Sequence, residues 1–127
     1  MRLGLRPWVI VLLGLAAAPR AVLHDLDLIH ERTGVNAVLV FVPLLVWVAV
    51  AVRWSANPFL SLLAVGGAYG VALAVVHNLL WDGGSVLLRG AITVSSLFTG
   101  LAVGAICGAI AWLVSWAVGS RRRGRAS

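Results

Sequence analysis

The sequence lacks lysine altogether and contains only four acidic residues, so ten arginines produce its formal net charge of +6. It has a single cysteine, Cys107, which excludes a disulfide within the chain. It also lacks a phosphate-binding glycine loop, a paired-cysteine metal motif and the glycine-flanked serine of a nucleophile elbow. The sequence therefore has none of the common motifs for nucleotide hydrolysis, structural zinc binding or serine hydrolase activity.

Apolar residues are abundant instead, at 61% of the 127 residues, against roughly 45–50% in soluble domains. Uninterrupted apolar runs of about 20 residues are typical of helices that cross a bilayer. Little sequence remains after four such runs are assigned, so no separate soluble domain is expected. The sequence therefore predicts an all-α protein, a single membrane domain (1–127) with four transmembrane helices in an antiparallel bundle. The predicted spans are 7–23, 35–54, 58–81 and 91–118.

The first run follows two arginines and ends near three alanines, as a signal peptide does. Pro19 directly follows the best cleavage position and apolar character resumes after it, so we expect an uncleaved span. Pro19 and Pro43 are each expected to kink their helix, because proline has no backbone N–H to donate. Asn57 and Pro58 are typical of a helix start and predict where the third span begins.

Arginines are distributed unevenly between the two sides of a four-span chain. Seven lie on the side of both termini and three on the other, which predicts that the termini are in the cytoplasm of a cell-membrane protein. The basic tail, 119–127, is expected to be disordered and to lie on anionic lipid headgroups. Because the arginines flank apolar runs rather than covering a folded module, no nucleic-acid partner is expected.

The stretch "HDLDLIHERTG" concentrates three of the four acidic residues and two of the three histidines. If the first helix continues through it, an amphipathic outer extension over 24–33 results, with Asp25 and His30 beside its polar face. A solvated helix face, a pH-responsive cluster and a divalent-metal site all remain open interpretations. The residues expected on the polar face are Arg20, His24, Asp27 and Glu31.

The third span contributes His77, Asn78 and Asp82 near the same side of the membrane. Ionisable groups within spans are rare and often functional, although a lone histidine bonded to a neighbouring helix is the simpler reading. His24 and His77 together also suggest ligands for a haem b iron in a helical bundle. No haem-attachment motif accompanies them, so no cofactor is predicted, and haem b or a divalent metal stays the alternative.

The fourth span carries small residues at strict four-residue intervals. Such spacing lets two helices approach closely, so it indicates either packing within the bundle or the seam of a homodimer. The third span repeats the pattern once. The row consists of Ser96, Gly100, Gly104 and Gly108, with Gly66 and Gly70 as its counterpart.

Three segments, "PRAVLHDLDLIHERTGVNAVLVFVPLLVW", "YGVALAVVHNLLW" and "VSSLFTGLAVGAICG", together resemble small four-span membrane proteins of GC-rich bacteria. The resemblance covers most of the chain and implies the architecture but no activity. We therefore expect a non-enzymatic membrane component that acts through helix packing or assembly with itself or another membrane protein. The alternative is a metal-, haem- or proton-linked protein with a site near the outer face.

Overall fold

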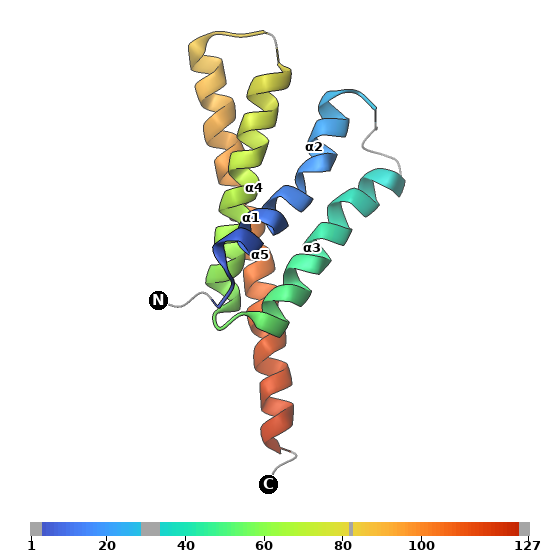
Figure 1. Cartoon of the computed structure of the whole chain (residues 1–127), viewed down its shortest axis with the longest axis vertical. Coiled ribbons are helices and arrows are strands. Elements are labelled where there is room, and N and C mark those ends of the chain that lie inside the picture. Colours follow the sequence, from blue (N-terminus) through green and yellow to red (C-terminus); the bar gives the residue numbers. More distant parts are fainter. Residues whose placement is uncertain (1–3, 29–33, 82, 125–127) are drawn as a thin grey trace.

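A computed structural model describes residues 4–28, 34–81 and 83–124, the last five of them by their backbone only, and these residues form α-helices and no strands. α4 and α5 lie side by side, and α1, α2 and α3 lie together on one side of that pair (Figure 1). The helices are α1 (Pro7–Ala16), α2 (Ala18–Asp25), α3 (Gly34–Trp54), α4 (Pro58–Leu80) and α5 (Val86–Gly124).

Four segments are long and apolar enough to cross a membrane: α1 together with α2, then α3, α4, and α5 as far as Gly119. This confirms the predicted number of candidate spans. Large apolar side chains point outward along them, and Leu79 and Phe98 are each 74% exposed. A surface this apolar suits lipid and would be unfavourable in water.

The first segment breaks at Ala17, two residues before Pro19. The Ala17 N–H bonds to the Gly14 carbonyl, three residues back, instead of continuing the regular four-residue pattern. The Leu13 carbonyl is thereby released, and the Trp47 indole N–H of α3 donates to it over 2.7 Å. The expected kink thus fixes α1 against α3. Pro43, by contrast, lies inside α3, which continues to Trp54.

α2 ends at Asp25, so the continuous helix expected over 24–33 is wrong for the described part of that stretch. The Leu28 N–H bonds to the Leu23 carbonyl, and the Asp27 N–H bonds to the His24 carbonyl. Asp27 has a φ of 57°, in the left-handed region. These are the two hydrogen bonds and the left-handed residue of a Schellman motif, which terminates a helix. Residues 29–33 lie outside the described part of the chain.

The glycine row of α5 packs against α4 of the same chain. A Cβ added to Gly104 would lie 2.5 Å from the Leu62 carbonyl oxygen and 2.9 Å from the Gly66 Cα. Gly100 faces Gly66 and Gly70 in the same way, and Gly108 meets the Phe59 backbone. The backbones themselves are therefore in contact, as small residues in apolar helices permit.

The core lies beside this contact, around Trp47, which is fully buried. Its ring meets the Tyr69 ring edge-on, with centroids 5.8 Å apart at 74°. Leu62 and Val65 of α4 are also completely buried. Trp47 therefore joins α1, α3 and α4 by one hydrogen bond and its apolar contacts.

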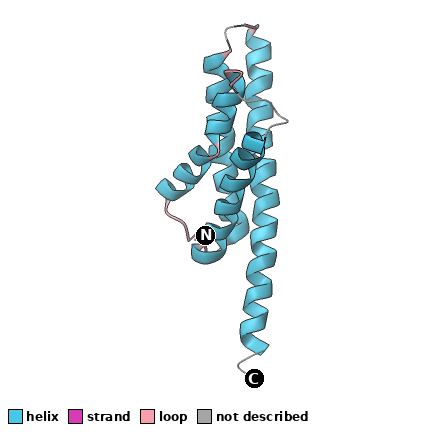
Figure 2. Cartoon of the chain, turned by 90° about the vertical axis from the view of Figure 1, so that its right-hand side faces the viewer, coloured by secondary structure: helices cyan, strands magenta, loops and turns pink. Residues whose placement is uncertain are grey.

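α5 is much longer than its neighbours. Its 39 residues extend about 58 Å at 1.5 Å each, against about 34 Å for the 23 residues of α4. Since Gly108 meets Phe59 near the start of α4, the residues after it extend past α4 (Figure 2). The helix continues to Gly124, so the disorder expected from residue 119 onward is wrong for the backbone to that point. Arginine is a good helix former and no proline interrupts the segment.

Replacing Gly104 by alanine or leucine is expected to destabilise the fold, because the backbones of α4 and α5 must separate. Overpacking of this kind costs about 1–3 kcal/mol for the alanine variant. Gly90→Ala on the same helix is the matched control, because a Cβ there meets nothing within 4 Å. Unfolding by denaturant in detergent measures both. Equal stability of the Gly104 and Gly90 variants would contradict the packing described.

Candidate functional site

Asp25 connects two helices at the end of the bundle where α2 and α4 terminate, here called the His77 end. Its Oδ2 forms a hydrogen bond of 2.5 Å with Nδ1 of His77, and its Oδ1 lies 3.9 Å from Nδ1 of His24. The Asp25 side chain is 18% exposed and the His77 side chain 33%. One carboxylate therefore lies close to both histidines.

The helix ends explain this arrangement. Asp25 is the last residue of α2, and His77 is in the last turn of α4, where cationic side chains are favoured by the helix dipole. The turn after Asp25 takes Asp27 out of helical register with His24. Asp25, the last residue before that turn, is the carboxylate that contacts His77 of α4.

Among the predicted site residues, the structure brings His24 and His77 together through Asp25, which the sequence placed beside the polar face. Helical register could place Asp25 only beside the polar face, because register does not tell how α2 is rotated toward α4. Asn78 lies next to this contact and donates to the Ala74 carbonyl and to Oγ1 of Thr93 on α5. The remaining predicted residues, Glu31, His30 and Asp82, lie outside the described residues.

Arg20, which the sequence placed on the polar face, bonds to an amide of another helix and forms no ion pair with a carboxylate among the described residues. Its Nε donates to Oδ1 of Asn36 on α3 over 2.8 Å, and the Asn36 residue is 9% exposed. Neither a motif nor a spacing identified Asn36 from the sequence. Its one signal is that it is a polar residue in the first turn of an apolar span.

The contacts at Asp25 involve only one nitrogen of each imidazole, Nδ1. A carboxylate bonded to Nδ1 is also the usual outer partner of a histidine whose Nε2 binds a metal, so these contacts leave the metal and haem alternatives open. No group of three metal-binding side chains is present among the described residues.

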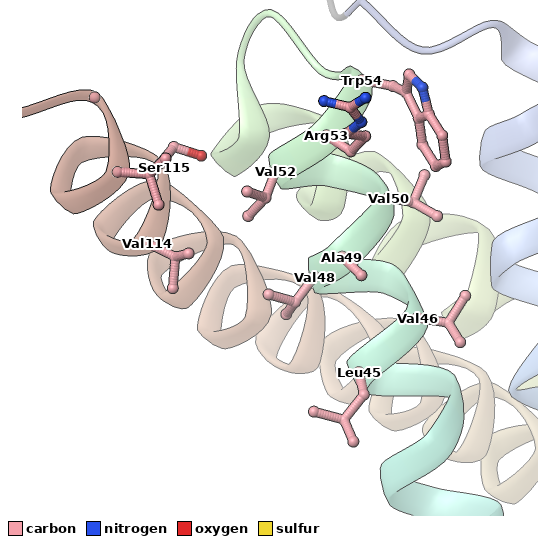
Figure 3. A pocket seen from close by; sticks show the side chains of 12 residues that line it. Leu45, Val46, Val48, Ala49, Val50, Val52, Arg53, Trp54, Val114 and Ser115 are labelled. Carbon is pink, nitrogen blue, oxygen red and sulfur yellow. The ribbon is translucent and has the colours of Figure 1, made fainter. Parts of the chain in front are cut away.

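A second feature lies at the opposite end of the bundle, where α3 terminates and α4 begins. An apolar groove of about 1030 Å³ runs between α3 and the far part of α5 (Figure 3). Val48 and Val52 project from α3 toward α5, and Arg53 and Trp54 lie at the end of the groove. The α5 side of the groove is lined by Val114, Ser115, Val118 and Gly119.

Ser115 is the polar residue of the α5 wall. Its Oγ is buried within the chain and has no hydrogen-bond partner among the described residues. A buried hydroxyl without a partner is unfavourable.

Comparison of the chain with known family models, with curated proteins and with solved structures finds no match. The resemblance to four-span bacterial membrane proteins accordingly stays a prediction.

The Asp25–His77 contact is expected to contribute measurably to stability. In a double-mutant cycle of Asp25→Asn and His77→Ala, we expect a coupling of about 0.5–1.5 kcal/mol, the usual range for one hydrogen bond. The matched control pairs Asp25→Asn with His24→Ala, whose ring nitrogen is 3.9 Å from the carboxylate. The control coupling should be smaller, and equal couplings would refute the assignment. Denaturant unfolding in detergent provides both values.

Proposed function

We propose that the protein is a non-enzymatic, multi-pass component of the cell membrane that acts by assembling with a second copy of itself. Its four helices form an antiparallel bundle with both termini in the cytoplasm. The excess of arginines on the terminal side supports this orientation. In it, the His77 end faces outward and the basic C-terminal segment meets anionic headgroups.

The glycine row is a poor candidate for the assembly surface. Gly66 and Gly104 are buried against each other between α4 and α5, so they are already used within one chain. A partner that bound there would have to displace α4. Assembly therefore requires another surface.

The observation that carries the proposal is the apolar extension of α5 beside an apolar groove. Trp112 and Trp116 are 53% and 67% exposed, and the helix there has passed the start of α4. Apolar patches of this kind mark contacts with protein or membrane. Because one chain carries both groove and extension, two copies related by a twofold axis can each insert an extension into the other's groove.

The groove is lined mainly by apolar side chains of α3 and α5. The volume of the groove, about 1030 Å³, leaves room for side chains of an incoming helix.

A photo-crosslinking amino acid at position 114 tests the assembly. Val114 lines the groove and is 40% exposed, so the probe should crosslink to a second copy in native membranes. The expected product is a covalent dimer joined to the partner's α5. The matched control places the same probe at Phe98, which is 74% exposed but distant along α5. Crosslinks to lipid alone, or equal dimer yield from both positions, would overturn the proposal.

The alternative is a metal-, haem- or proton-linked site near the outer face, and the Asp25–His77 contact favours its proton-linked form. That contact joins two candidate spans through ionisable side chains. Ionisable groups at such positions often serve function in membrane proteins.

Cofactor content separates the alternative from the assembly role. We expect the purified protein to show no haem absorption band and no stoichiometric metal, because the described residues include no group of three metal-binding side chains and the sequence has no haem-attachment motif. A band or bound metal in the native protein that disappears in His24→Ala and His77→Ala would establish the metal or haem form instead. The control is Asn78→Ala, which leaves both imidazoles in place.

A further inference from the structure

A small cavity lies between the helices, apart from both the Asp25 contact and the groove, and one residue of its wall, Thr99, is exposed. Its volume is about 150 Å³, and residues of α2, α3, α4 and α5 contribute to its wall. Most of the wall is apolar, and the polar atoms come from three side chains. The lining residues that matter here are Arg20, Leu44, Tyr69, Thr99 and Val103.

Arg20 brings a permanent positive charge to this cavity. A guanidinium group has five N–H donors, and the bond from Nε to Asn36 uses one of them. No carboxylate among the described residues forms an ion pair with it. A charge within a membrane-spanning segment is costly unless it is paired or reaches water. Among the described residues, only Asn36 accepts a hydrogen bond from the Arg20 side chain, so its terminal N–H groups can serve an anion.

The position of Asn36 orients this charge. Because Oδ1 of Asn36 accepts from Nε, the hydrogen bond holds the guanidinium at the nitrogen that joins it to the alkyl part of the side chain. The two terminal nitrogens then present parallel N–H groups, the geometry that matches the two oxygens of a carboxylate.

Tyr69 and Thr99 add hydroxyl groups to the same wall. The Tyr69 ring is fixed by its edge-on contact with Trp47, which limits where its hydroxyl can point. Leu44 and Val103 form apolar wall opposite any polar head. The cavity thus combines one cation and two hydroxyls with an apolar remainder, which is the usual composition of a small-ligand site.

The size of the cavity limits the ligand. An engineered apolar cavity of 150 Å³ in another protein binds benzene, a molecule of six non-hydrogen atoms. A ligand of similar size that carries one carboxylate satisfies both the charge and the apolar wall. We propose that this cavity binds a small aliphatic monocarboxylate, whose carboxylate pairs with Arg20 and whose hydrocarbon part contacts Leu44 and Val103.

Butyrate, with six non-hydrogen atoms, is the probe for this site, and butyramide is its neutral counterpart of equal size. Calorimetric titration of the intact protein in zwitterionic lipid discs, where no anionic headgroup competes, should show saturable butyrate binding. Butyramide should bind at least about tenfold more weakly, because it has no charge to pair with Arg20. Absence of saturable butyrate binding, or equal affinity for both compounds, would overturn the proposal.

Variants assign the binding to this cavity. Arg20→Lys keeps the charge but loses the paired donors, so butyrate affinity should fall about tenfold. Tyr69→Phe keeps the ring on Trp47 and removes only the hydroxyl, so it tests the site even if the Arg20 variant fails to fold. It should lower affinity several-fold. Arg89→Lys, at an exposed position on α5 that lines neither the cavity nor the groove, is the matched control and should bind as the native protein does. Native affinity in both Arg20→Lys and Tyr69→Phe would refute the site.

Discussion

The backbone contact between α4 and α5 is the constraint on which the rest of the structure depends. At Gly66 and Gly104 the two helices approach until main-chain atoms touch, and any larger side chain would force them apart. In an apolar environment close packing of this kind, rather than the exclusion of water, holds helices together. The α4–α5 pair therefore forms the surface against which the other helices are arranged.

The first three helices pack on that surface through a tryptophan side chain rather than through a backbone contact. The break before Pro19 releases the Leu13 carbonyl, and Trp47 donates to it from α3. An unpaired carbonyl in an apolar region would be costly, so the break and the tryptophan compensate each other. The same tryptophan ring contacts Tyr69 of α4. One side chain thereby links the proline break to the α4–α5 pair.

Polar and apolar features are separated along the bundle. The Asp25–His77 contact lies at one end, the Arg20–Asn36 bond lies deeper within it, and the groove beside Ser115 lies at the other end. This separation would allow the proposed assembly surface and the proposed ligand cavity to coexist in a short chain. Neither requires the residues of the other.

Features set by neighbouring residues could be predicted from the sequence. The apolar runs predicted four candidate spans because helix length and hydropathy are local properties. Asn57 was predicted to cap α4, and its Oδ1 accepts from the Leu60 N–H. The four-residue spacing of glycines indicated a close helix contact, but did not indicate which helix would supply the other side.

Other features depended on a single backbone angle or on contacts between distant residues. Asp27 adopts a left-handed conformation without being glycine, which ends α2. Asp25, which the sequence placed beside the polar face, is the residue bonded to His77. A register argument anticipates neither, because the first depends on one backbone angle and the second on how α2 is rotated against α4. The sequence by itself determined four apolar helices and most of their ends, since short-range hydrogen bonding and hydropathy fix them. Only the tertiary structure decided the partners of Arg20, His77 and the glycine row, since these depend on how each helix is rotated and placed against the others.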